Sequence, residues 1–450
     1  MQLERYKTDL LKEVAYINLL ILDITGNIRN IYLPAARFDD ILKNGARFDA
    51  SAYGYAEPGD SEMTAVISGS AAFIETQENS KILHILCDVL SPDGEPLEQY
   101  PRTVIKKAKD FMAEQKVADT AKVRVVLEYY VFGEAEFNNE EDSSYFRVSL
   151  PDEFAGSSGS SLKGTPSVGY GKMMKEDCLA AVTGETVGLL NTVGIPVKSF
   201  RREGALPKIK MELDFMDVVQ ASDMVTLARW IICRAASESG LRVTFMPKPL
   251  CGMPGSGMRI LQLLEKNGSP LFNGDTFLGL SDAGLSYTAG LLFHSVTGSL
   301  LTFACQGTNS YRRLARAGGA PMRAAFSKNL QDAAVRVTTC QSDENVGLEY
   351  VAGDAAGNIY FFMAALILAG ADGLFKEMNP VWLGYHSREA KKELILPRDL
   401  DSALDGLEKD AGYLAPAFPE EFAERWIKIK RAEAEYVYNA PTPQEYELYF

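Results

Sequence analysis

The first hundred residues show hydrophobic runs and turn residues that predict a small unit of strands and one helix. Residues 16–34 (YINLLILDITGNIRNIYLP) place apolar positions on both sides of a Thr-Gly-Asn turn, which predicts a two-stranded hairpin. A short helix is expected next, because Phe38 and Ile41 recur at helical spacing and Gly45 follows as its stop. Residues 81–90 predict a further strand. Since strands and helix do not alternate regularly, we expect an α+β unit that ends near residue 100.

The pattern changes at Pro101, where a larger region begins. A helix is expected over residues 102–116 and a strand over residues 123–132 (VRVVLEYYVF). Ser222 is expected to cap a helix that ends near Gly240.

Three further stretches complete the expected elements. Residues 134–171 are rich in Ser, Gly and acidic side chains, which favours a long and partly mobile excursion. Residues 358–371 (NIYFFMAALILAGA) are apolar but too few to span a bilayer, so they predict a buried helix. Helical patterns return near residues 400–410 and 420–438.

Composition and charge limit the classes of partner. With 450 residues and 46% hydrophobic content, the chain is long enough for two domains with sizeable cores. Sixty Asp and Glu residues against 46 Lys and Arg residues give a net charge of -14. No basic footprint is available for nucleic acid or an anionic membrane, so small molecules and protein partners remain.

The cysteines and the first residues of the chain indicate the cellular compartment of the protein. Six cysteines are scattered without a CxxC pair, which is typical of buried thiols in a reducing environment and argues against a zinc or disulfide framework. The opening residues MQLERYKTDLLKEV are charged throughout and lack the apolar core of a secretory signal. We therefore expect a cytoplasmic protein.

Glycines cluster in one segment, residues 245–262 (FMPKPLCGMPGSGMRILQ), where the backbone must approach another group. Alone, this is a weak phosphate-binding signal, because it lacks both the Lys-Ser/Thr ending of a P-loop and the GxGxxG spacing of a dinucleotide fold. Without the context of the other motifs, a tight loop needed only for chain reversal explains this segment better than a phosphate site does.

The order of several motifs carries more information than any one of them. The segments FMPKP, GSGM, TNSYRRL, the Ala-Pro pair at residues 320–321 and NIYFFMAALILAGADGL follow one another as in the catalytic domain of the glutamine synthetase family, which this sequence resembles. Upstream, FDASAYGYAE, CDVLSPDGEP and YPRTVIKKA are similar to that family's N-terminal domain and domain junction. Downstream, LPRDLDSALDGLEKD and TPQEYELYF are similar to its last helices, so the resemblance covers roughly residues 14–450.

The resemblance implies a fold, a chemistry and an assembly. It implies an α+β glutamine synthetase fold with a small β-grasp-like domain over residues 1–100 and a large antiparallel-sheet and helix domain over residues 101–450. The family joins ammonia to glutamate with ATP, using two divalent metals held largely by carboxylates. It also implies a homo-oligomer of stacked rings, a dodecamer in the bacterial arrangement, with each site between two subunits.

Half of the family's metal ligands are replaced in this chain. By the resemblance, Glu128, Glu203 and Glu349 match ligand positions. The other three ligand positions hold Val126, Lys210 and Arg259. None of the three histidines can supply the missing ligand from its own sequence position, and His294 fits a core histidine better than a ligand.

Substrate positions are partly kept. By the resemblance, Arg313 grips the substrate carboxylate, Gly255 and Arg336 serve substrate and nucleotide binding, and Asp49 helps to bind ammonium across a subunit boundary. Structural ion pairs for the arginines and a subunit brace for Asp49 are the alternatives. Other expected family residues are replaced, at Ala52, Pro254, Gly319, Gln331 and Val351.

Three functions are therefore open. The first is an oligomeric binding or regulatory paralogue whose ligase activity is lost or strongly impaired, for which no cofactor is expected. The second is a divergent ATP-dependent γ-glutamyl ligase, and the third is a true glutamine synthetase. Both of these need ATP with Mg²⁺ or Mn²⁺.

In the first function, side-chain cations replace the metals. Arg259 is expected to pair with Glu349, and Lys210 with Glu203 or Glu128. Three carboxylates with these two cations carry the same net charge, -1, as the family's five carboxylates around two divalent ions.

Overall fold

The N-terminal region folds around one five-stranded sheet. In a computed structural model, the described residues are 13–59, 61–77, 80–151, 178–203, 207–314, 323–330, 332–340, 345–386 and 394–450. The sheet has the order β2-β1-β5-β4-β3, with β1 and β5 parallel and the other pairs antiparallel. Its strands are β1 (Val14–Leu22), β2 (Ile28–Pro34), β3 (Ala46–Asp49), β4 (Glu62–Gln77) and β5 (Ser80–Leu90). The predicted hairpin is confirmed as β1 and β2.

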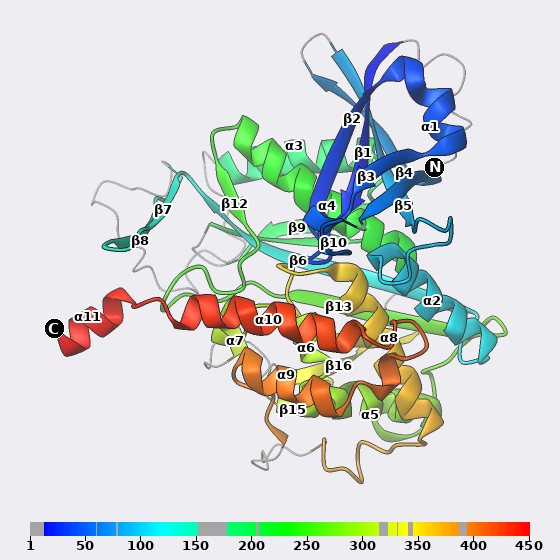
Figure 1. The fold of residues 1–450 in the computed structure, drawn as a ribbon. Coiled ribbons are helices and arrows are strands. Elements are labelled where there is room, and N and C mark those ends of the chain that lie inside the picture. The colour runs from blue at the N-terminus through cyan, green and yellow to red at the C-terminus, as the bar shows by residue number, and fades with distance from the viewer. Residues whose placement is uncertain are drawn as a thin grey trace.

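One helix of this region follows the predicted pattern closely. Helix α1 (Phe38–Asn44) buries Phe38 and Ile41, and it ends at Gly45 with a φ of 71°. A positive φ is readily adopted by glycine, which explains why the helix stops there. The N-terminal unit occupies one end of the molecule, above the larger region (Figure 1).

The larger region is built on a ten-stranded sheet with β6 (Thr120–Phe132) near its centre. The main path has the order β15-β16-β17-β13-β6-β10-β9, and three short strands attach to β6 or β13. The remaining strands are β9 (Val197–Arg202), β10 (Lys208–Leu213), β11 (Met216–Asp217), β12 (Arg242–Thr244), β13 (Met258–Lys266), β14 (Ser269–Pro270), β15 (Arg323–Ser327), β16 (Ala333–Thr339) and β17 (Val346–Tyr350). Strand β6 pairs with β10 on one side and β13 on the other, so residues from three strands meet around it.

Helices pack around this sheet and form the core with it. They are α2 (Pro101–Glu114), α3 (Cys178–Thr192), α4 (Val218–Glu238), α5 (Asp282–Thr297), α6 (Leu301–Ala304), α7 (Thr308–Leu314), α8 (Ile359–Phe375), α9 (Leu400–Lys409), α10 (Phe422–Tyr438) and α11 (Pro443–Tyr449). Short 3₁₀ turns cover Ala35–Arg37, Ser51–Tyr53, Phe277–Gly279 and Gly412–Leu414. The apolar segment predicted as a buried helix is α8, which is capped by the Asn358 side chain. In the described part of the chain, no helix has both the length and the apolar character needed to cross a bilayer.

Two expectations about local structure need correction. The start of the expected excursion is an ordered hairpin of β7 (Ala135–Asn139) and β8 (Ser144–Val148), while residues 152–177 lie outside the described residues. Ser222 does not cap α4, because Asp217 accepts a hydrogen bond from the Val219 amide at 3.1 Å. Ser222 is buried one turn inside the helix, where its hydroxyl donates to the Val218 carbonyl.

Buried polar contacts join the N-terminal unit to the larger region. The fully buried Arg102 guanidinium donates to Asp223 on α4 at 2.9 and 3.0 Å and to Asp88 on β5 at 2.5 Å. Near the β1–β2 turn, the Asn358 side chain donates to the Ile24 carbonyl at 3.1 Å. A Cβ on Gly26 would lie 2.6 Å from the Asn358 Cα, so the turn packs closely against the start of α8.

Candidate active site

Charged side chains gather on one face of the ten-stranded sheet. Alternate residues of a strand point to the same face, and the strand register therefore places ten charged residues together. We call this the charged face: Arg124, Glu128, Arg201, Glu203, Lys208, Lys210, Glu212, Arg259, Arg336 and Glu349.

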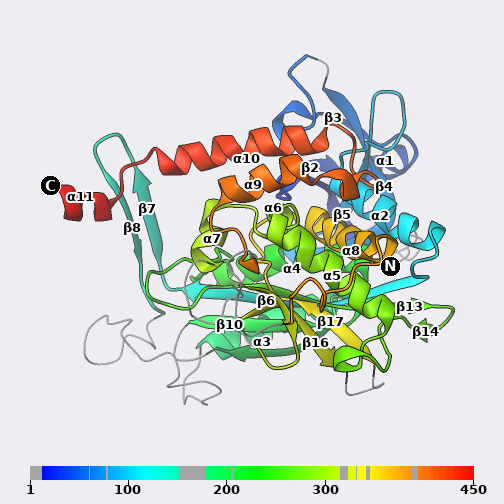
Figure 2. The same cartoon turned by 90° about the horizontal axis from the view of Figure 1, so that it is seen from below.

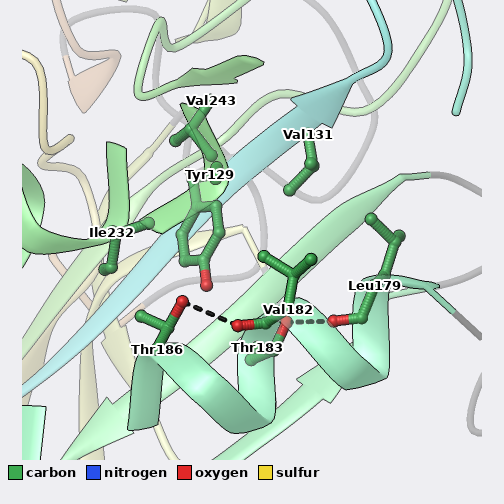
Figure 3. A pocket seen from close by; sticks show the side chains of 9 residues that line it. Tyr129, Val131, Leu179, Val182, Thr183, Thr186, Ile232 and Val243 are labelled. Carbon is green, nitrogen blue, oxygen red and sulfur yellow. Dashed lines mark hydrogen bonds between the residues drawn. The ribbon is translucent and has the colours of Figure 1, made fainter. Parts of the chain in front are cut away.

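The opposite face of β6 is apolar and covered by helices. Tyr129 and Val131 point there, toward Thr183 and Thr186 of α3 (Figure 3). The cavity between them has a volume of about 10 Å³, which holds at most one water molecule. Only the charged face therefore offers polar chemistry around the centre of the sheet.

Glu128 is the most deeply buried carboxylate of the charged face, with 5% of its surface exposed. Its carboxylate accepts from the Lys208 ammonium at 2.8 Å, the Gly257 amide at 3.0 Å and Arg259 Nη2 at 3.3 Å. Burial alone would raise the pKa of Glu128, but Lys208 and Arg259 outweigh it and lower that pKa to about 2. Glu128 is therefore held as an anion by groups of the chain itself.

Lys208 bridges two of the predicted ligand positions. Its ammonium donates to Glu128 at 2.8 Å and to Glu203 at 3.0 Å, and only 4% of the residue is exposed. Glu203 follows β9 directly, and its amide donates to the Lys208 carbonyl, which fixes the two side chains near each other. Sequence reasoning missed Lys208, although its position two residues before Lys210 on one strand places both on the same face.

Lys210 does not make the expected contact with Glu128 or Glu203. The register sets it directly opposite Glu128 on one side and Arg201 on the other. Among the residues that the structure describes, Lys210 forms no ion pair within 4.0 Å. Burial lowers the pKa of Lys210, and the nearby Arg259 lowers it further.

The partner expected for Glu349 is also different. Arg336 Nη1 lies 3.6 Å from the Glu349 carboxylate, whereas Arg259 pairs with Glu128. Burial lowers the pKa of Arg336, and Arg259 contributes in the same direction. The two guanidinium groups are therefore close enough to repel each other.

The glycine-rich segment makes room for Arg313. A Cβ on Gly255 would lie 2.5 Å from Arg313 Cγ, and one on Gly257 would lie 3.1 Å from its Nη1. Arg313 is 6% exposed and donates to the backbone carbonyls of Ala352 and Gly353, the latter at 3.0 Å. The glycines thus allow a buried arginine to pack beneath the loop, and Arg313 stays separate from the ion pairs of Glu128.

Asp49 lies on the N-terminal sheet, away from the charged face. It ends β3 with an exposed side chain that accepts from the Ser51 amide at 2.9 Å. Hydrogen bonds from Ser61 and Ser51 lower the pKa of Asp49. A role across a subunit boundary remains a prediction from the resemblance.

The residues at the replaced substrate positions of the family lie in different parts of the structure. The Pro254 carbonyl accepts from the Tyr130 hydroxyl at 2.7 Å, and Val351 is 4% exposed. Ala52 lies in the 3₁₀ turn after β3. Gly319 and Gln331 lie outside the described residues.

The three carboxylates predicted as metal ligands do not fit a pair of divalent metals. Lys208 occupies the space between Glu128 and Glu203, and Arg336 pairs with Glu349. In the described parts of the chain, no three His, Cys, Asp or Glu residues are grouped so that they could hold a metal ion. With Lys208 and Arg336 counted beside Lys210 and Arg259, four cations surround three carboxylates, which changes the expected net charge of -1 to +1.

Comparisons with known proteins agree with this fold over nearly the whole chain. The family described as "Glutamine synthetase, catalytic domain" matches residues 98–449, and "Glutamine synthetase, beta-Grasp domain" matches residues 13–92. The glutamine synthetase of Nostoc sp. is 29% identical over 464 residues, covering 98% of this chain and 97% of the relative. The glutamine synthetase of Mycolicibacterium smegmatis is 30% identical over 463 residues, covering 98% and 96%.

Solved structures are also similar to this chain over nearly its whole length. A Plasmodium falciparum glutamine synthetase determined by cryoEM has a TM-score of 0.88 at 22% identity, covering 99% of this chain and 98% of that one. A GmaS/ADP complex has a TM-score of 0.80 at 24% identity, covering 98% and 99%. The N-terminal β-grasp unit, the large sheet with its helices and the matches over both domains show that this chain belongs to the glutamine synthetase family.

Proposed function

We propose that this protein is a member of the glutamine synthetase family whose ligase activity is lost or strongly impaired, and that it acts as an oligomeric binding or regulatory protein. The position of Lys208 carries the proposal. Its ammonium lies 2.8 Å from Glu128 and 3.0 Å from Glu203, where the family would place divalent metal. Phosphoryl transfer depends on such metals to position the phosphates and neutralise developing charge.

A second candidate is a divergent ATP-dependent ligase that joins a carboxylate to an amine. Family membership favours it, because relatives of 29–30% identity are named glutamine synthetase. Arg336, matched to a phosphate-binding arginine by the resemblance, is also present on the charged face. In this candidate the reaction must proceed although the Lys208 ammonium lies between Glu128 and Glu203, and we therefore place it second.

A closed homo-oligomer in the cytoplasm is part of the proposal. Large apolar side chains are exposed on the β7–β8 hairpin and the last helix, including Phe137, Phe146, Leu448 and Tyr449. Such exposure is typical of surfaces that other chains cover. Free buried thiols such as Cys87 and Cys305 are consistent with a reducing compartment.

Two measurements on the full chain test the loss of activity. Glutamine formation is assayed with ATP, glutamate, ammonia and either Mg²⁺ or Mn²⁺, beside the Nostoc sp. enzyme as a positive control. Mn²⁺ binding is followed separately by electron paramagnetic resonance. We expect no measurable glutamine and no tight Mn²⁺ site, whereas rapid metal-dependent synthesis would overturn the proposal.

A restoration variant sharpens the test. Val126→Glu, Lys210→Glu and Arg259→His return the family's ligand types, and Lys208→Ser removes the competing ammonium. We expect the combined variant to gain Mn²⁺ binding over the parent chain. Tight Mn²⁺ binding by the parent chain that this variant does not improve would show that the native side chains already form a competent site.

A further inference from the structure

A groove of about 440 Å³ lies between helix α2 and the start of helix α4. This volume falls within the range of about 300–1,000 Å³ that is typical of small-molecule sites. Its polar lining consists of Lys106, Lys109 and Asp110 from α2, with Asp217, Gln220 and Asp223 on the opposite wall. None of these residues belongs to the charged face, so the groove is separate from the candidate active site.

Both lysines of the α2 wall have protons left for a ligand. Lys106 Nζ donates to Asp88 at 2.7 Å, and Lys109 Nζ lies 2.8 Å from Asp217. In the described part of the chain, each ammonium has this one partner. An ammonium carries three protons, so those not used by Asp88 or Asp217 can bind a carboxylate. The two lysine side chains are 41% and 38% exposed, which lets a solute reach them.

A carboxylate in the same groove is free to bind a positive group. Asp110 is exposed, and it forms no ion pair within 4.0 Å among the residues that the structure describes. Asp217 on the opposite wall already has Lys109 as its partner. Asp223 is 2% exposed, and its carboxylate accepts from Arg102 at 2.9 and 3.0 Å. Asp110 therefore lies beside two ammonium groups as the carboxylate that can still accept a ligand cation.

The groove carries charges of both signs in nearly equal number. With the ion-pair partners Arg102 and Asp88 included, three cations and four carboxylates surround it, which gives a formal net charge of -1. A phosphate or a nucleotide would meet a surface of its own sign. A zwitterion instead brings a carboxylate for the lysines and an ammonium for Asp110, so both of its charges find a complementary group.

We propose that this groove binds a free α-amino acid as a zwitterion, with its carboxylate on Lys106 and Lys109 and its ammonium on Asp110. The inference goes beyond the proposed function and does not depend on it, because the groove shares no residue with the charged face. The ligand would contact both α2 and α4, which the Arg102–Asp223 ion pair already joins. Since it binds the folded chain, it should also raise the stability of that chain.

Calorimetric titration of the full chain with L-alanine, L-serine and L-glutamine tests the proposal. The amide of each amino acid lacks the carboxylate, and its N-acetyl derivative lacks the ammonium, so these compounds are the ligand controls. We expect at least one amino acid to bind and to raise the midpoint of thermal unfolding. Its amide and its N-acetyl derivative should bind at least about tenfold more weakly. Binding of either derivative as tight as that of the amino acid would overturn the zwitterion site.

Two variants locate the site without disturbing the fold. Asp110→Asn removes a carboxylate that has no ion pair in the described part of the chain. Lys106→Gln leaves Asp88 bound to the Arg102 guanidinium. We expect each variant to weaken binding about fivefold or more, because each loses one charged contact to the ligand. Circular dichroism checks that both variants are folded.

Lys107→Gln is the matched control on the same helix. Lys107 is 40% exposed, as Lys106 is 41% exposed, but Lys107 pairs with Glu98 and does not line the groove. Its replacement should leave the affinity within about twofold. Binding that neither groove variant weakens, or that Lys107→Gln weakens equally, would overturn the assignment to this groove.

An assay of glutamine synthesis on the same preparations separates this inference from the proposed function. Absence of binding by all three amino acids, in a chain that makes no glutamine, overturns only the groove site. Amino-acid binding by a chain that does make glutamine overturns only the loss of ligase activity. Glutamine synthesis without any binding that the groove variants weaken overturns both.

Discussion

Glu128 shows how one buried carboxylate can be kept ionised without metal. Three donors from three different strands or loops converge on it, and two of them are cationic side chains. Replacing such an ion pair by apolar groups can be neutral, but removing one partner leaves a charge buried without compensation. Lys208 lies closer to Glu128 than Arg259 does, so we expect its removal to cost more of the free energy of unfolding.

Lys208→Met should lower the free energy of unfolding by about 3–5 kcal/mol, because it removes the ammonium between Glu128 and Glu203. Urea denaturation followed by circular dichroism measures the change. Lys210→Met is the matched control on the same strand, and we expect it to cost less than about 1 kcal/mol. Equal losses in the two variants would show that Lys208 has no special role.

The sequence identified residues that the structure brings together on one face, but it did not assign their ion pairs. Glu128, Glu203, Arg259 and Lys210 do lie on one face, as the matched motifs indicated. Lys208 was missed because an alignment by position compares residue types and does not give the direction in which a long side chain extends. The pairing depends on which ammonium reaches Glu128, and that is decided by how the side chains of β10 extend toward β6.

At the scale of elements, one buried histidine on α5 links this helix to α8 and to the end of α9. His294 on α5 lies 2.9 Å from Asp372 on α8 and 2.8 Å from Asp410 after α9. The prediction that it is a satisfied core histidine is confirmed. Burial alone would lower the pKa of His294, but hydrogen bonds to Asp372 and Asp410 outweigh it and raise that pKa.

This raised pKa predicts how stability depends on pH. Because the folded state binds the proton more tightly than the unfolded state, the contribution is complete below the unfolded pKa of about 6.5 and is lost as pH rises through the folded value. Denaturation of the wild type at about pH 6 and pH 9 should show this loss. His294→Gln should remove that part of the pH dependence, while His386→Gln, at an exposed position, should retain it. A wild type whose stability rises over this interval would contradict the assignment.

Elements with strong periodicity were predictable, and those set by competing local signals were not. Helix α8 follows from an unbroken apolar run, and β1 and β2 follow from their turn. The β7–β8 hairpin was missed because its strands are only five residues long, mix aromatic with polar residues and lie within a stretch of loop-forming composition. Ser222 was a plausible cap by residue type, but Asp217 lies at the actual start of the helix and competes better for its free amides.

At the scale of the whole molecule, the exposed hairpin and C-terminal helix lie on one side. Figures 1 and 2 show β7, β8 and α11 extending from the same side of the body. Asn139 donates to the Tyr436 hydroxyl at 3.0 Å, which links the hairpin to α10. Phe137 and Tyr449 are each 84% exposed, so this side presents aromatic surface to a further chain.

Light scattering coupled to gel filtration should therefore give a mass several times that of one chain at micromolar concentration. A chain shortened after Asn439 lacks α11, and we expect it to form a smaller assembly. Exposed Trp382 serves for comparison, because Trp382→Ala removes a large aromatic side chain from a different loop and should leave the mass unchanged. A monomer for the full chain would contradict the expected ring.

The contacts between the two regions also affect how the chain folds as it is made. The hydrogen bond from Asn358 to the β1–β2 turn can form only after 334 more residues have been synthesised beyond Ile24. Arg102 can bind Asp223 only after 121 more residues. At synthesis rates of about 5–20 residues per second, the first delay lasts roughly 15–70 s. During the longer interval the N-terminal sheet has left the ribosome with its β1–β2 turn uncovered, and for the first part of it Arg102 on α2 still lacks Asp223. Because surfaces exposed for that long can associate wrongly, we expect the nascent N-terminal sheet to be held by chaperones until its later contacts form.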